Sequence, residues 1–124
     1  MAMTDTFRRR EKSYEAKYKL EEEQRFKIAS RRNRLLGLWA AEQMGLARPE
    51  GDAYARDVVA VDLNEPGVGD VVAKVVKDLH RHGVHVAEAE VRRRLDEFQA
   101  VATKEVQAEY PKPLGPDHDR VGDV

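Results

Sequence analysis

The sequence predicts an all-α protein: a four-helix bundle with a long first helix and a flexible basic N-terminal arm. The chain of 124 residues is rich in Ala, Glu, Lys, Arg, Leu and Val but only 6% aromatic, a composition that favours helices over a sandwich or barrel. Apolar residues recur at helical spacing in several segments, as expected for helices that bury one face. A chain of this length is expected to form one domain with a modest core.

The stretch from Phe7 to Lys27 is predicted to be helical but poorly packed. Its opposite charges recur three or four residues apart, yet each such pair contributes only about 0.2–0.5 kcal/mol. Because most helical stability in proteins comes from packing, we expect residues 1–19 to form a flexible arm when the protein is alone. Residues 1–34 hold eleven Lys or Arg against six Asp or Glu, while the whole chain has net charge -1. A basic arm therefore joins an acidic body.

The arm has two interpretations that composition does not separate. It is either a solvated charged tail with no specific role, or a helix that forms on docking into a partner. In the second case the aromatic anchors are Phe7, Tyr14 and Tyr18.

The first core helix occupies residues 28–46. On a helical wheel its large apolar residues form a face wide enough to cover a core, with a central line of Ile28, Leu35, Trp39 and Leu46 and with Leu36 and Leu38 on the flanks. The only tryptophan is thus predicted to lie on a buried stripe. Gly45 and Pro49 are the signals that end this helix.

Three shorter helices are expected next. Residues 52–63 have apolar residues at helical spacing, although their valines leave a strand possible. Asp70 is placed as the N-cap of a third helix, which ends at Gly83. The fourth runs from about 87 to about 109, before two prolines that stop it. The predicted core comprises Leu35, Leu36, Leu38, Trp39, Val58, Val75, Leu79, Leu95 and Phe98.

These segments define three parts of the chain. Residues 1–19 are the flexible arm, residues 20–110 are the four-helix body, and residues 111–124 are a disordered tail because they are rich in Pro, Gly and Asp. The absence of cysteine removes any disulfide frame or thiolate metal site. No stretch is apolar for long enough to cross a bilayer, and no signal core is evident. We therefore expect a cytoplasmic protein without direct membrane insertion.

No catalytic site assembles from the sequence, so we do not expect an enzyme. His80, His82 and His85 cluster near the end of the third helix, but a helical metal pair needs a spacing of three or four residues. The glycines at 67 and 69 precede a helix without the third glycine or the buried strand of a dinucleotide site. We expect neither a metal nor a tightly bound cofactor.

The run from Arg31 to Arg34 allows a second reading of the protein. A basic helix is the usual footprint of nucleic-acid binding, so the alternative function is a nucleic-acid- or ribosome-associated small helical protein. Against it, Arg32 lies close to the apolar stripe, where it would extend over the core or pair with an acidic residue of the body. The chain as a whole is slightly acidic. We expect no nucleic-acid partner.

Several motifs in order and spacing form a recognisable pattern. They are Phe7-x-x-Arg10-Glu11-x-x-x-Glu15-Ala16-Lys17-Tyr18, Arg31-Arg32-Asn33-Arg34-Leu35-Leu36-Gly37-Leu38-Trp39-Ala40-Ala41, Tyr54-Ala55-x-x-Val58-Val59, the turn from Asp62 to Gly67, and Asp70-Val71-x-x-Lys74-Val75-x-x-Asp78-Leu79. The pattern resembles the ζ subunit family, the ATPase inhibitors of F-type ATP synthases in alphaproteobacteria. The resemblance runs from about Thr6 to about Ala108.

The resemblance implies a four-helix fold and a regulatory role. It implies that the N-terminal segment enters an interface between the α and β subunits of the catalytic head, folds there as a helix and blocks rotation of the central-stalk γ subunit. The protein would then associate peripherally with the inner membrane through the ATP synthase. The resemblance also leaves room for weak ADP or ATP binding by the body, with no residues assigned. The inhibitory role falls on Phe7, Arg10, Glu11, Glu15, Ala16, Lys17 and Tyr18.

Overall fold

The computed structural model describes the backbone of residues 2–110 and the side chains of residues 19–110. Within this range the chain forms four helices and no strand: α1 (Ala2–Gln43), α2 (Glu50–Asn64), α3 (Val68–Arg81) and α4 (Glu88–Glu109). The predicted all-α fold with a long first helix is confirmed. The tail predicted to be disordered, residues 111–124, lies outside the described residues. The flexibility of residues 1–19 stays a prediction.

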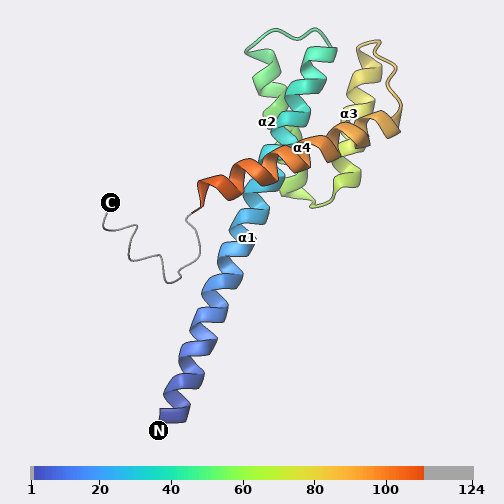
Figure 1. The fold of residues 1–124 in the computed structure, drawn as a ribbon. Coiled ribbons are helices and arrows are strands. Elements are labelled where there is room, and N and C mark those ends of the chain that lie inside the picture. The colour runs from blue at the N-terminus through green and yellow to red at the C-terminus, as the bar shows by residue number, and fades with distance from the viewer. Residues whose placement is uncertain (1, 111–124) are drawn as a thin grey trace, which may run out of the picture.

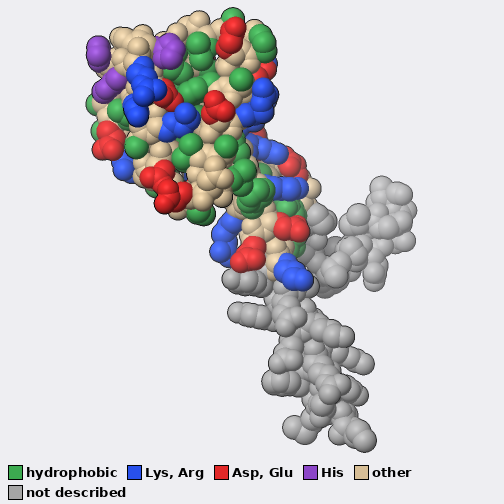
Figure 2. Space-filling model, turned by 180° about the vertical axis from the view of Figure 1, so that it is seen from behind, with side chains coloured by type: hydrophobic (Ala, Val, Ile, Leu, Met, Phe, Trp, Pro, Cys, Tyr) green, Lys and Arg blue, Asp and Glu red, His purple; other side chains and the backbone are tan. Residues whose placement is uncertain are grey.

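The helices are arranged around the second half of α1. Figure 1 shows α1 as one long rod whose N-terminal half projects away from the other three helices. α2 runs back beside α1 and α4 crosses it, and these two helices make the most extensive contacts with α1. The face of the body that Figure 2 shows carries charges of both signs mixed with apolar side chains.

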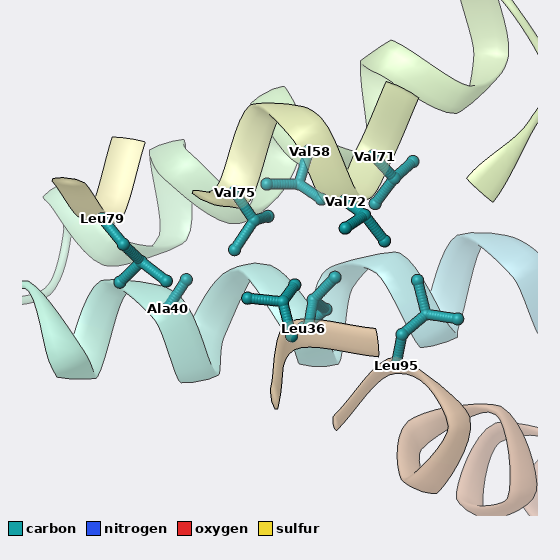
Figure 3. Close-up of a cluster of buried hydrophobic side chains, with 9 residues drawn as sticks. Leu36, Ala40, Val58, Val71, Val72, Val75, Leu79 and Leu95 are labelled. Carbon is teal, nitrogen blue, oxygen red and sulfur yellow. The ribbon is translucent and has the colours of Figure 1, made fainter. Parts of the chain in front are cut away.

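The core is built mainly from aliphatic side chains that all four helices contribute (Figure 3). α3 contributes most, because its valines lie on one face at helical spacing and that face points inward. Each fully buried side chain of this kind contributes about 1.5–3 kcal/mol. The most deeply buried are Leu36, Val58, Val71, Val72, Val75, Leu79 and Val91.

The buried face of α1 is centred differently from the predicted line, and this part of the prediction is wrong. Ile28, Leu35, Trp39 and Leu46 are only half-buried. The fully buried positions are instead Asn33, Leu36, Gly37, Ala40 and Ala41. The reason is steric: small residues at the centre let α2 approach closely, and the larger apolar side chains cover the edges of the contact. A wheel that weights residues by hydropathy places large side chains at the centre.

The half-buried core candidates lie together at one edge of the body. Leu35, Leu38, Trp39 and Phe98 line a surface hollow of about 400 Å³. Phe98 and Trp39 pack against the core cluster from outside. They therefore seal the core from solvent without lying inside it.

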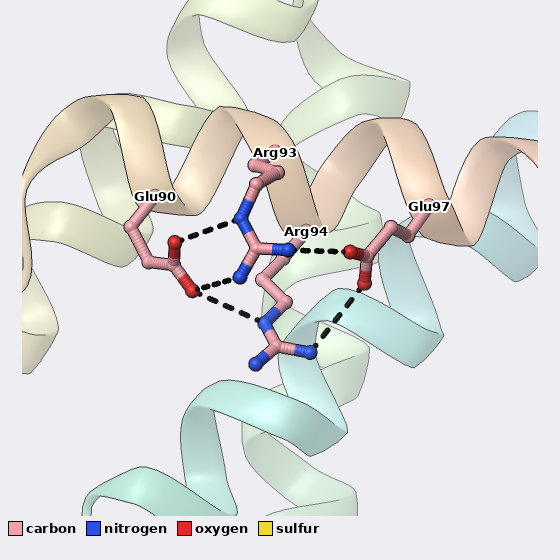
Figure 4. Close-up of polar contacts among 4 residues, drawn as sticks. All are labelled: Glu90, Arg93, Arg94 and Glu97. Carbon is pink, nitrogen blue, oxygen red and sulfur yellow. Dashed lines mark hydrogen bonds and ion pairs between the residues drawn. The ribbon is translucent and has the colours of Figure 1, made fainter.

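Trp39 is covered on its outer side by the guanidinium of Arg94, which lies 5.5 Å from the ring centroid. Arg94 is held in turn by carboxylates on its own helix, at 3.3 Å from Glu90 and 3.4 Å from Glu97 (Figure 4). Arg93 contacts the same two carboxylates at 2.7 Å each. The hydrogen bonds from Arg93, followed by the nearby guanidinium charges, lower the pKa of Glu90 below its usual value. The two arginines and two glutamates therefore form a network of ion pairs along α4.

The contact between α1 and α2 depends on Gly37. A Cβ atom at this position would lie 2.7 Å from the Cα of Ala55 and 3.2 Å from Cγ2 of Val58. The first of these is a backbone atom of the neighbouring helix, so the two helices would have to move apart.

Gly37→Ala is therefore expected to lower the free energy of unfolding by about 1–3 kcal/mol, the usual cost of overpacking a core. Gly69→Ala is the matched control, because its Cβ would meet nothing within 4 Å and the change restricts the unfolded chain. Urea unfolding followed by circular dichroism measures both. Equal stability of the Gly37 variant and the parent would contradict the close packing of α1 on α2.

The turns after α1 and α3 contain the glycines predicted to end these helices. The starts of α2 and α3 differ from the prediction. Gly45 and Gly83 adopt φ values of 74° and 79° after α1 and α3, a region that glycine occupies without strain. α2 begins at Glu50, two residues before its predicted start. Asp70 is not an N-cap, because α3 begins at Val68 and the cap position is Gly67. The Gly67 N–H donates to Asp62 Oδ1 at 3.0 Å, which fixes the turn.

Tyr54 joins α2 to α3. Its hydroxyl donates to Asp78 Oδ2 at 2.8 Å, and Lys74 Nζ donates to the same oxygen at 3.0 Å. Burial, and then the hydrogen bond to Asp78, raise the pKa of Tyr54 well above its usual value. The folded protein therefore keeps this tyrosine protonated at a pH where the unfolded chain ionises it.

Tyr54→Phe is expected to lower the free energy of unfolding near pH 8 by about 1.5–3 kcal/mol, the usual contribution of a hydrogen bond to a charged group. The parent is expected to lose stability as the pH rises through about 10, because there the unfolded state releases the tyrosine proton and the folded state does not. Urea unfolding at about pH 8 and about pH 11 measures both effects. If the variant lost as much stability as the parent between these values, Tyr54 would not be the group responsible.

Candidate partner-binding arm and its root

The predicted inhibitory residues lie on the projecting half of α1. The helix is continuous from Ala2 to Gln43, 42 residues, which corresponds to about 60 Å at 1.5 Å per residue. The side chains of residues 1–18 lie outside the described residues, so their contacts and roles stay predictions. These positions are Phe7, Arg10, Glu11, Tyr14, Glu15, Ala16, Lys17 and Tyr18.

The helical repeat relates the arm to the core. Positions 7, 14, 18, 25, 29 and 36 follow one another at intervals of seven or four residues, which keeps them on one side of a continuous helix. Leu36 is fully buried in the body. The three aromatic positions of the arm therefore lie on the side of α1 that continues the core face. In Figure 1, α2, α3 and α4 all lie beside the C-terminal half of α1, away from its projecting half.

The stretch of α1 between the arm and the body, residues 19–27, is exposed at every position except the half-buried Gln24. Its larger apolar side chains are 39% exposed at Leu20 and 57% exposed at Phe26. The Glu21–Arg25 pair, 3.9 Å apart, is also largely exposed. Pairs of this kind contribute little, so residues 19–25 depend mainly on the helix itself for their stability.

Just past this stretch, the end of α4 is fastened to α1. The guanidinium of Arg31 hydrogen-bonds both carboxylate oxygens of Glu109 and lies 3.5 Å from Glu105. The hydrogen bond with Glu109 raises the pKa of Arg31 and lowers that of Glu109. Lys27 Nζ lies 5.0 Å from the centroid of the Tyr110 ring. These contacts mark the root of the arm, because along the described part of α1 they are the first ion pairs and cation–π contact that join it to another helix.

The neighbouring Arg32 and Asn33 point inward. Arg32 is 9% exposed, and its guanidinium lies 3.6 Å from Asp62 and donates to Gln99 at 3.1 Å. Asn33 is fully buried and donates to Asp62 at 3.1 Å. The predicted pairing of Arg32 with an acidic residue of the body is confirmed. Arg32 is therefore committed to the fold and is not available to a phosphate, which weakens the case for a nucleic-acid site at residues 31–34.

The remaining candidates for chemistry do not assemble. His80 and His85 have ring centroids 5.4 Å apart, while His82 bonds the carbonyl of Asp78. The histidines gather at the end of the body away from the arm (Figure 2). No three metal-ligating side chains converge among the residues that the structure describes.

None of the helices in that range is long and apolar enough to span a bilayer.

Sequence reasoning missed the basic groove at the root of the arm. Lys27, Arg34 and Arg56 line one groove with Phe26, although Arg56 comes from a different helix. The signal available in the sequence was Phe26 itself, a large apolar residue outside the apolar face of its own helix. The partner helix that completes the groove could not be read from the pattern of one helix.

Comparisons with known proteins agree with this geometry. The model of the family described as ATPase inhibitor subunit zeta matches residues 3–105. A chain described as a solution NMR structure of the protein is 42% identical, with a TM-score of 0.59, and the match covers 68% of this chain and 96% of that chain. No curated protein matches this chain. The family match spans the arm and the four-helix body, and on this basis the chain belongs to the ATPase inhibitor subunit zeta family.

Proposed function

We propose that this protein inhibits ATP hydrolysis by the F-type ATP synthase. Its arm enters an interface between the α and β subunits of the catalytic head as a helix and blocks rotation of the central-stalk γ subunit. The protein is cytoplasmic, and it reaches the inner membrane only through its association with this enzyme. The inhibition is steric and does not require a catalytic group in the inhibitor.

The observation that carries this proposal is the projection of α1 beyond the body. Residues 19–26 are exposed apart from the half-buried Gln24, and the helix before them continues for several turns (Figure 1). A charged helix without tertiary contacts is marginally stable in water, so its length is explained best by a partner that completes its packing. The cost of ordering such a segment on binding keeps the affinity adjustable.

The aromatic positions of the arm support the same proposal. Phe7, Tyr14 and Tyr18 share one side of α1, which suits an amphipathic helix laid into a groove between two protein surfaces. The surrounding basic residues favour an acidic interface and fast association. The bound arm is proposed to block the rotation that accompanies ATP hydrolysis. Inhibition of hydrolysis is therefore expected to exceed inhibition of synthesis.

The test combines a rate measurement with a map of contacts. ATP hydrolysis by the detached catalytic head is measured with increasing amounts of the full-length protein. A photo-reactive amino acid at position 14 then identifies the subunits that the arm contacts, and the same group at the exposed position 77 is the control. Inhibition with cross-links from position 14 to α, β or γ is the expected result. No inhibition at a large excess over the head would overturn the proposal.

A further inference from the structure

A groove of about 650 Å³ lies at the root of the arm, between α2 and α4. α1 lines it with Phe26, Lys27 and Arg34, and α2 with Arg56. α4 contributes Glu105 and Glu109. Three helices therefore share the lining of the groove.

The groove carries a net positive charge. Its two carboxylates both contact Arg31, which offsets part of their charge. Lys27, Arg34 and Arg56 form no ion pair with any carboxylate in the described part of the chain. Arg34 and Arg56 are exposed, and exposed basic side chains without a carboxylate partner attract an acidic surface and raise its rate of association.

The groove also has an apolar contact point. Phe26 is 57% exposed and stands between two charged residues, Arg25 and Lys27. Covering a side chain of this size removes a large apolar area from water. A basic groove with one exposed aromatic ring fits an acidic peptide segment that carries an apolar side chain.

We propose that this groove binds an acidic segment at the rim of the same ATP synthase head that receives the arm, and so forms a second contact with that partner. This inference rests on the proposed function. Its support is continuity along one helix: Phe26 is seven residues after Lys19, about 10 Å at the helical rise. A protein that encloses the arm as far as Lys19 has its rim within reach of the groove.

A nucleic acid fits the groove less well. Glu105 and Glu109 belong to its lining, and carboxylates repel phosphates. Among the described residues of the lining, Phe26 is the only aromatic one, whereas single-stranded nucleic acids are bound by stacking on several rings. The acidic protein segment is the occupant that satisfies both the charge and the apolar contact.

The test uses full-length variants that leave residues 1–19 unchanged. Arg34→Glu with Arg56→Glu reverses two groove charges, and Phe26→Ser removes the apolar contact. The matched control is Lys77→Glu with Arg81→Glu, which reverses two exposed charges on α3. We expect each groove variant to raise the half-inhibitory concentration about tenfold, mainly through slower association for the charge reversal. The control is expected to match the parent.

The outcomes separate the groove from the arm. If the parent inhibits and the groove variants inhibit equally well with the same salt dependence, the groove proposal fails while the inhibitory function stands. If the parent itself does not inhibit, the proposed function fails and this inference fails with it. Sedimentation of the parent as a dimer that the groove variants abolish, or RNA binding that they abolish, would overturn the proposal by assigning the groove a different occupant.

Discussion

Removal of residues 1–19 is expected to abolish inhibition of ATP hydrolysis while the rest of the protein stays folded. The helix after this point is exposed as far as Lys27, apart from Gln24, and the buried core residues of α1 all follow Lys27. Buried aromatic residues often carry most of the energy of an interface. We therefore expect the half-inhibitory concentration to rise by at least about 100-fold.

The measurement is ATP hydrolysis by the detached head, with thermal unfolding of the shortened protein as the folding control. A full-length variant with Phe7, Tyr14 and Tyr18 all changed to Ser keeps the charge of the arm and loses its anchors. If the anchors act as proposed, this variant behaves like the deletion. Full inhibition by the shortened protein would place the inhibitory surface on the body and remove the arm from the mechanism.

Asp62→Ala is expected to be among the most destabilising single changes in the body. Asp62 accepts hydrogen bonds from the Asn33 amide and the Gly67 N–H and lies 3.6 Å from the Arg32 guanidinium. Burial lowers the pKa of Arg32, and the charge of Asp62 opposes that effect. Without Asp62 the largely buried charge of Arg32 loses its carboxylate partner, and the fully buried amide of Asn33 loses its acceptor. Breaking such a pair costs about 3–5 kcal/mol.

Urea unfolding measures this loss, and Asp57→Ala on the same helix is the matched control because Asp57 is exposed. Asp62→Asn separates charge from geometry, since it keeps an acceptor oxygen and removes the charge. Its stability is expected to fall between those of the parent and Asp62→Ala. A loss below about 1 kcal/mol for Asp62→Ala, the level of a surface pair, would mean that water replaces the carboxylate and that the network does not hold α1 to α2.

The proposed inhibitory function and the fold depend on different parts of α1. Up to about Lys27 the helix is exposed, and after Arg31 its inward-facing residues pack on or bond to the other helices. Mutations on the two sides of this boundary are therefore expected to separate affinity for the ATP synthase from stability of the protein. The groove at this boundary lies on the body, but we propose that it binds the ATP synthase.

The sequence by itself determined the helical class, the approximate extents of α2, α3 and α4, and the division of α1 into a charged half and an apolar half. Hydrophobic periodicity and glycine or proline punctuation are local signals, and a helix obeys local signals because its hydrogen bonds join residues four apart. The motifs from Phe7 to Leu79 also indicated the family, which the match over residues 3–105 supports.

Only the tertiary structure decided which side of α1 is buried and what its polar residues do there. Gly37 and Ala40 are central because α2 approaches them closely, and hydropathy gives small residues little weight. Arg31 contacts Glu109, which lies 78 residues later in the chain, and Arg32 contacts Gln99, which lies 67 residues later. No local sequence pattern indicates contacts over such separations. The groove at the root of the arm belongs to the same class. Its charge comes from separate helices, and only their packing brings these residues together.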